Sequence, residues 1–307
     1  MQFEKQNLER RSVARVLISV SDKSAIEDFS NSLVKNGIEI VSTGGTSKIL
    51  SENGIPVTAV EDVTKFPEMM NGRVKTLHPL IFGGILARDS DKSETEQYDI
   101  GIIDMVVCNL YPFGTVASKG VDMDALIEEI DIGGPSLLRA AAKNHARVAV
   151  VTDPSDYDWI SNEIEAGGLN LEQRRQLALK AFRHTAEYDT IIQNELSSRF
   201  GEEDLPSSLH VTGVGSPPLR YGENPHQSAI FYSDTSVKGP CVSNSAQIQG
   251  KQLSYNNLLD FDAALAIIME FEEPTTIIVK HNNPCGAASA SGAVVGRNGC
   301  IGRHNSD

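Results

Sequence analysis

The run ARVLISV at residues 14–20 decides the fold expected for this chain, because it opens a regular alternation of strands and helices. A short apolar run of this kind is typical of a buried parallel strand. The alternation continues as helix, strand, helix and strand, predicted over residues 21–37, 38–42, 43–54 and 57–60. Such a rhythm predicts an α/β fold with a parallel sheet.

Polar side chains follow several of these strands. Ligands of parallel sheets bind at the carboxyl ends of the strands. Ser21-Asp22-Lys23 follows the first strand, and Thr43-Gly44-Gly45-Thr46 turns the second strand into a helix. The glycine loop is a candidate phosphate cradle, although it is neither a Walker A sequence nor GxGxxG. A further strand at 104–111 carries Asn109 and Tyr111 at its end, and a last strand is predicted at 148–151.

The stretch IDIGGPSLLRAAAKNH at residues 130–145 carries several polar and charged side chains at the point where a loop is predicted to become a helix. Ser136 is the expected N-cap of a helix over 137–143, and the glycines before it let a ligand approach the backbone. Lys143 lies seven residues after Ser136 and shares its face of the helix. The alternative is a capped helix with a solvated cationic edge.

The loop GRVKTLHP at residues 72–79 carries two cations between a glycine and a proline. Arg73 and Lys75 suit a phosphate group, and an exposed basic turn is the alternative. His78 is equally compatible with a structural role and a functional role. Cys108, in the strand predicted at 104–111, is expected to be a buried packing residue.

The bulk composition is that of a globular protein of 307 residues, with 41 acidic against 27 basic residues and a net charge of −14. This balance argues against nonspecific nucleic-acid binding, which needs a basic surface. Four scattered cysteines without CxxC spacing fit a reducing cytoplasm. No apolar run approaches the roughly 20 residues of a membrane span, and residues 1–13 are expected to form a flexible leader without a signal-peptide core.

The second part of the chain is predicted to hold few elements. A long helix at 172–200 precedes it and carries His184 and Tyr188 on a face expected to pack or to contact another subunit. A Pro-, Gly- and Ser-rich stretch at 201–218 marks a boundary. Beyond it we expect strands at 229–232 and 275–279 around a helix at 256–270, with Lys280-His281 as an acid/base candidate. This is a thin core for an independent domain.

Several motifs occur together and in order: TGGT (43–46), GRVKTLHP (72–79), CNLYPF (108–113), IDIGG (130–134), RAAAKNH (139–145), LRYGENPHQ (219–227) and KHNNPCG (280–286). In this combination the chain closely resembles the bifunctional purine-biosynthesis family that joins an IMP cyclohydrolase to an AICAR formyltransferase. The resemblance implies a methylglyoxal-synthase-like α/β domain at 14–200, a linker at 201–218, and the start of a cytidine-deaminase-like α/β formyltransferase domain at 219–288. Residues 289–307 are expected to be an aberrant or disordered tail, and residues 292–307 match nothing in the family.

The resemblance implies that the first domain cyclises the formamido nucleotide FAICAR to IMP with loss of water. Lys75, Tyr111, Asp131 and Lys143 match the family's catalytic group. Phosphate and ribose would be held by Ser21, Lys23, Gly44, Gly45, Thr46, Arg73 and Thr76. Asn109, Asp131, Ile132 and Gly133 would orient the heterocycle and its carboxamide. Which catalytic group moves which proton stays open from the sequence.

By the same resemblance, Arg220 and Tyr221 would bind AICAR, and Lys280 and His281 would serve formyl transfer from 10-formyltetrahydrofolate. The formyltransferase half of the family is far longer, so we expect only an inactive fragment here. No metal or organic cofactor is expected for the cyclohydrolase, no nucleic acid or membrane as a partner, and a homodimer in the full-length family. The alternatives are a regulatory module of the same fold that binds a phosphorylated metabolite, and methylglyoxal synthase itself.

Overall fold

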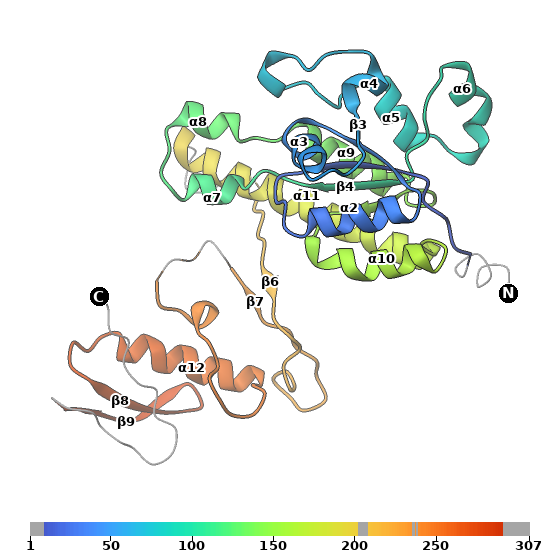
Figure 1. Ribbon diagram of the computed structural model, residues 1–307. Helices are drawn as coiled ribbons and strands as arrows, with labels where there is room; N and C mark the ends of the chain where they lie inside the picture. Colours follow the sequence, from blue (N-terminus) through green and yellow to red (C-terminus); the bar gives the residue numbers. More distant parts are fainter. Residues whose placement is uncertain (1–8, 202–207, 235–236, 238, 291–307) are drawn as a thin grey trace. The chain divides into compact units, whose positions relative to one another are not determined.

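The computed structural model describes residues 9–201, 208–234, 237 and 239–290, and the chain divides into two compact units, Met1–Pro206 and Ser207–Asp307 (Figure 1). Parts of the predicted leader (1–8), linker (202–207) and tail (291–307) lie outside the described residues.

The first unit is built on a five-stranded sheet of order β3-β2-β1-β4-β5. All neighbouring strands pair in parallel, which confirms the predicted α/β class. The strands are β1 (Arg15–Val20), β2 (Glu39–Ser42), β3 (Thr58–Ala59), β4 (Met105–Asn109) and β5 (Ala149–Val151). Every residue of β4 and β5 is buried, which explains why these strands are continuous apolar runs rather than alternating patterns.

Helices pack in layers against this sheet (Figure 1). On one side α2 (Ile26–Lys35) packs on β2, and α10 (Tyr157–Glu165) packs on α2. On the other side α9 (Gly133–Lys143) packs on β4 and β5, and α5 (Pro79–Leu86) and α11 (Leu171–Phe200) pack on α9. Shorter helices are α3 (Gly44–Glu52), α4 (Val60–Thr64), α6 (Lys92–Gln97), α7 (Phe113–Ala117) and α8 (Met123–Glu128). Among the described residues, no helix combines the length and apolar character that crossing a bilayer requires.

The strand order creates a switch point between β1 and β4. The chain runs outward from β1 to β2 and β3, and then crosses back to place β4 on the other side of β1. The last pair of the β1–β4 ladder joins Val20 to Asn109. Open α/β sheets bind ligands outside the carboxyl ends of the strands at such a point. A ligand site is therefore expected at the loops that follow Val20 and Asn109.

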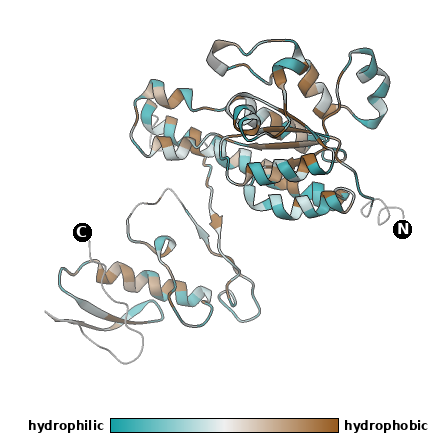
Figure 2. Cartoon of the chain, viewed as in Figure 1, coloured by the Kyte–Doolittle hydropathy of each residue, from teal (hydrophilic) through white to brown (hydrophobic). Residues whose placement is uncertain are grey.

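The described residues of the second unit form two small antiparallel pairs and one long helix. β6 (Val214–Gly215) pairs with β7 (Tyr232–Ser233), and β8 (Thr275–Lys280) pairs with β9 (Asn283–Ser289). Between the pairs lie the short 3₁₀ turn η4 (Val242–Asn244) and α12 (Tyr255–Ile268), which is largely hydrophobic in Figure 2. Within the described part of this unit, only Ala264 and Ile277 are buried hydrophobic residues.

Two sequence predictions for this unit differ from the structure. The strand expected at 229–232 starts only at Tyr232, and β9 was not predicted. β8 and β9 form a hairpin whose turn residues, His281 and Asn282, both have positive φ, at 52° and 66°. Two-residue turns of this kind match the twist of hairpin strands. The Lys280-His281 pair is therefore part of a tight hairpin turn.

Candidate functional site

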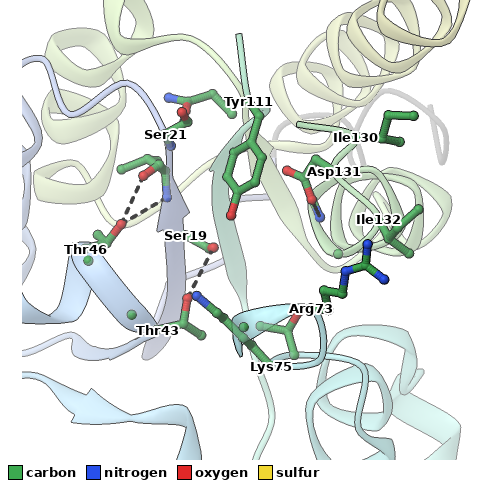
Figure 3. A pocket seen from close by; sticks show the side chains of 18 of the residues that line it. Ser19, Ser21, Thr43, Thr46, Arg73, Lys75, Tyr111, Ile130, Asp131 and Ile132 are labelled. Atoms are coloured by element: carbon green, nitrogen blue, oxygen red, sulfur yellow. Dashed lines mark hydrogen bonds between the residues drawn. The ribbon is translucent and has the colours of Figure 1, made fainter. Parts of the chain in front are cut away.

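A cavity of about 730 Å³ opens at the switch point of the first unit (Figure 3). Pockets for small molecules typically measure about 300 to 1,000 Å³. It is lined by the loops after β1, β2 and β4, by the segment 70–77, and by the end of α8 and the start of α9. Of the residues expected to act in the cyclohydrolase, it brings together Ser21, Lys23, Gly44, Gly45, Thr46, Arg73, Lys75, Thr76, Asn109, Tyr111, Asp131, Ile132 and Gly133.

The start of α3 forms one wall of the cavity. Thr46 is buried, and its hydroxyl donates to the carbonyl of Val20 (3.1 Å) and accepts from the Val20 N–H (3.3 Å), which ties the helix to the end of β1. Thr43 precedes the helix and makes no side-chain capping bond to it. A helix start that faces a cavity in this way favours an anionic group.

Asn109 lines the cavity and also supports the loop after β1. Its Oδ1 accepts from the N–H groups of Ser21 (2.7 Å) and Asp22 (2.8 Å), and its Nδ2 donates to the carbonyl of Asp22 (3.0 Å). The side chain is 8% exposed. Through these three hydrogen bonds, Asn109 holds the backbone of Ser21 and Asp22 in place.

Lys75 reaches the cavity through a slot between two glycines. A Cβ built on Gly44 would lie 3.0 Å from Lys75 Nζ, and one on Gly72 would lie 2.6 Å from Lys75 Cε. Both glycines have positive φ, at 47° and 91°, which other residues adopt only with strain. Glu68 Oε1 lies 3.4 Å from Lys75 Nζ and partly balances its charge. The ammonium group is thus held in place while its side chain stays 28% exposed to the cavity.

Asp131 lies opposite Lys75 and is held by backbone donors (Figure 3). Its Oδ1 accepts from the N–H of Gly134 at 2.8 Å. Burial raises the pKa of the carboxyl above its usual value, although the N–H groups of Gly134, Gly133 and Tyr111 and the charge of Lys75 pull the pKa down. A carboxylate with a raised pKa is a stronger base than an exposed one, so Asp131 is suited to accept a proton.

Tyr111 and Arg73 lie at the more open part of the cavity. Tyr111 follows the end of β4 and is 43% exposed. Arg73 pairs with Glu128 of α8, with Nε 3.2 Å from Glu128 Oε2, and both side chains are exposed. Exposed pairs contribute little to stability, so this contact leaves Arg73 available to an anionic ligand.

The start of α9 differs from the prediction. The helix begins at Gly133 and not after Ser136, and Ser136 donates its hydroxyl to the carbonyl of Ile132 (2.8 Å) from inside the first turn. Pro135 is accommodated because the first turn of a helix does not need its N–H. The N-cap position is Ile132, and the carboxylate of the preceding residue, Asp131, accepts the Gly134 N–H.

Lys143 does not line this cavity. It is the last residue of α9 and is exposed, whereas the cavity lies at the helix start. At 1.5 Å per residue, the ten steps from Gly133 to Lys143 correspond to about 15 Å along the helix. The structure therefore separates Lys143 from Lys75, Tyr111 and Asp131.

The predicted formyltransferase residues lie in the second unit around the first turns of α12. The Arg220 guanidinium stacks 4.8 Å from the Tyr221 ring centroid and donates to the Tyr221 hydroxyl (3.0 Å), and this bond lowers the pKa of that phenol. The carbonyl of Tyr221 accepts from the N–H of Tyr255, and the hairpin after Lys280 bonds to Asp260 through the Asn282 N–H (2.7 Å). Lys280 and His281 are exposed.

A second cavity of about 440 Å³ adjoins the carboxyl ends of β4 and β5. Lys180 bridges Asp153 (2.6 Å) and Asp156 (2.7 Å) there. His184 also lines it, with a buried Nε2 that has no hydrogen-bond partner among the described residues and with a pKa that burial lowers. The packing role expected for His184 therefore does not account for Nε2.

Sequence reasoning missed that Glu68, Glu128 and Tyr188 contact residues that line the first cavity. Glu68 lies four residues before the basic loop 72–79, so an acid close to two cations was an available signal. Glu128 is 55 residues from its partner Arg73 in the sequence, and Tyr188 is 57 residues from its partner Asp131. No local sequence pattern predicts contacts over such separations.

Comparisons with known proteins match both parts of the chain. Residues 141–296, about half of the chain, match the family described as AICARFT/IMPCHase bienzyme, and residues 25–136 match the MGS-like domain. Among solved structures, the crystal structure of ForH is similar, with 37% sequence identity and a TM-score of 0.54. That match covers 60% of this chain and 100% of the ForH chain. The MGS-like match spans β2, β3 and β4 and most of the cavity lining.

Proposed function

The chain belongs to the AICARFT/IMPCHase bienzyme family, and on this premise we propose that its first unit cyclises FAICAR to IMP with loss of water. The observation that carries the proposal is the convergence of Lys75, Tyr111 and Asp131 in one cavity beside a glycine-rich helix start. The cavity volume of about 730 Å³ suits a nucleotide.

The 5′-phosphate would bind between the start of α3 and the cations of the neighbouring loops. Gly44, Gly45 and Thr46 offer the helix start, and Lys23 and Arg73 offer positive charge. Ser21 and Thr76 are polar groups that suit the ribose. Holding the nucleotide by its phosphate places its two reacting groups in a fixed orientation. The loss of freedom needed to reach that orientation is a large part of the barrier to ring closure, and binding supplies it in advance.

In the ring closure, the carboxamide nitrogen attacks the formyl carbon, and a C–N bond forms while the formyl C=O becomes an alkoxide. Asp131 would accept the proton from the carboxamide nitrogen, a poor nucleophile that needs this help. Lys75 would stabilise the developing alkoxide, and Tyr111 would donate a proton to the same oxygen. Loss of this hydroxyl together with the proton of the formamide N–H releases water and leaves the C=N bond of IMP between the former formyl carbon and the formamide nitrogen. The proposal gives no step to Lys143.

The test is to add FAICAR to the purified chain, follow the absorbance change of ring closure, and identify IMP by chromatography. We expect complete conversion of FAICAR to IMP. Saturable binding of FAICAR without IMP would instead favour a regulatory module that binds phosphorylated metabolites. If FAICAR is neither bound nor converted, the first unit is neither a cyclohydrolase nor a regulatory module that binds this metabolite.

We further propose that this 307-residue chain does not transfer formyl groups. Only Ala264 and Ile277 are buried hydrophobic residues in the described part of the second unit, and side chains such as Leu259, Ile278 and Phe271 are exposed. A unit that buries so little apolar surface cannot hold a catalytic site rigidly. With AICAR and 10-formyltetrahydrofolate, we expect no release of tetrahydrofolate above background from a preparation that converts FAICAR. Release that depends on the enzyme concentration and is lost in Lys280→Ala would contradict this.

A further inference from the structure

Tyr188 of α11 contacts the turn that carries Asp131. Its side chain is 7% exposed. The hydroxyl oxygen accepts from the backbone N–H of Asp131 (2.8 Å), and the O–H donates to the backbone carbonyl of Glu129 (3.2 Å). One hydroxyl therefore closes both ends of the turn 129–131, which leads directly into the first turn of α9.

The ring of Tyr188 supports a second segment of the site. It meets Phe113 edge-on, with ring centroids 6.4 Å apart and an interplanar angle of 75°. Phe113 is 1% exposed, and its N–H donates to the carbonyl of Tyr111 (2.8 Å). The residue that holds the Asp131 turn thus also packs against the segment that follows Tyr111.

These two segments are joined to each other at the carboxylate of Asp131. The backbone N–H of Gly134 donates to that carboxylate at 2.8 Å, and the backbone N–H of Tyr111 also acts on it and lowers its pKa. The space is closely filled, since a Cβ on Gly134 would lie 2.4 Å from Asp131 Oδ2. A small shift of the turn 129–131 would therefore displace the carboxylate from its donors.

Core packing alone does not account for the hydroxyl of Tyr188. The ring contact with Phe113 needs only a phenyl group, whereas the hydroxyl pairs two backbone groups of a turn that lines the cavity. Burial raises the pKa of Tyr188 to about 12, so the hydroxyl keeps the proton that it donates to Glu129 at neutral pH. An unpaired buried N–H or carbonyl would otherwise weaken this turn.

We propose that Tyr188 is a positioning residue that holds the Asp131 carboxylate, and through Phe113 the Tyr111 segment, in the geometry needed for ring closure. The inference rests on the proposed function for its catalytic consequence, but the contact with the Asp131 turn is independent of it. Tyr188 itself does not line the cavity and touches no substrate in this assignment.

The test is Tyr188→Phe, which keeps the ring and removes the hydroxyl. We expect kcat for FAICAR cyclisation to fall about tenfold or more, since small misplacements of reacting groups are costly. KM for FAICAR should change by less than about twofold, because the phosphate-binding loops lie on other elements. Tyr157→Phe is the matched control, since Tyr157 is buried against Phe29 on α2 and contacts neither segment. It should leave both constants unchanged.

A second measurement separates this inference from the proposed function. The Asp131 carboxyl is followed by ¹³C NMR of aspartate-labelled protein, with Asp131→Asn to assign the signal. In Tyr188→Phe, we expect its titration to move toward the ordinary aspartate value as the turn opens to water. If the wild type makes no IMP, the proposed function fails, and the titration alone decides the positioning role. A variant that loses only thermal stability, with kcat and the Asp131 titration unchanged, overturns the inference.

Discussion

Replacing Lys75 with alanine is expected to slow IMP formation about a hundredfold to a thousandfold, the range found when one charge-stabilising donor is removed from an active site. The ammonium group lies in the slot between Gly44 and Gly72 with Glu68 as its counter-ion, and it faces the cavity that Asp131 enters from the other side. The fold should persist, because the Lys75 side chain is partly exposed and belongs to a loop. The measurement is kcat for FAICAR cyclisation, together with the circular dichroism spectrum.

Two variants sharpen this prediction. Lys48→Ala removes an exposed lysine of α3 whose contact with Glu52 is a surface ion pair at 3.8 Å, and it should leave kcat unchanged. Lys75→Arg keeps the charge but needs more room than the slot between the two glycines offers, so we expect it to stay impaired. Wild-type turnover in Lys75→Ala would remove Lys75 from the catalytic group.

The sheet of the first unit could be predicted because its strands are apolar runs separated by helical periodicity. β4 is buried at every residue, and its sequence reads accordingly as a strand that is covered on both faces. β9 could not be predicted in the same way, since NPCGAAS contains proline, glycine and alanine and every residue of it is exposed. Its pairing depends on the turn at His281 and Asn282, where two residues other than glycine adopt positive φ.

The composition of the cavity was largely predictable, and its internal geometry was not. Parallel strands bring their carboxyl ends to one edge of a sheet, so the loops after β1, β2 and β4 had to meet. Two predictions drawn from the residue spacing along α9 differ from the structure. Ser136 is a strong N-cap residue by type, yet the helix begins three residues before it, and Lys143 shares a helical face with Ser136 but not its position along the axis.

The contacts that hold the catalytic candidates come from residues that no local pattern connects. Asn109 looked like a substrate ligand, but its amide is used by the backbone of Ser21 and Asp22, 87 to 88 residues away in sequence. Tyr188 looked like a packing residue on a helix face, and its hydroxyl contacts Glu129 and Asp131. Such roles depend on how α11 is placed against α9, which sequence periodicity does not specify.

Replacing Asp131 with asparagine tests the other side of the proposed chemistry. The variant keeps the size of the side chain and an oxygen that can accept the Gly134 N–H, but it cannot take a proton from the carboxamide. We expect IMP formation to fall about a hundredfold to ten-thousandfold, the range attributed to general acid–base catalysis. Asp124→Asn, on the exposed face of α8, is the matched control and should retain the wild-type rate.

The pH dependence gives this variant a second, independent readout. The ionised carboxylate is the active form of a base, so the wild-type rate should fall as pH drops through the pKa of Asp131. Burial raises that pKa, and the fall should therefore begin at a higher pH than an ordinary aspartate would give. The residual rate of Asp131→Asn should lack this acid limb, because no carboxylate remains to be protonated. If the limb persists in the variant at the same pH, the titrating base is another group, and Asp131 then only orients the carboxamide.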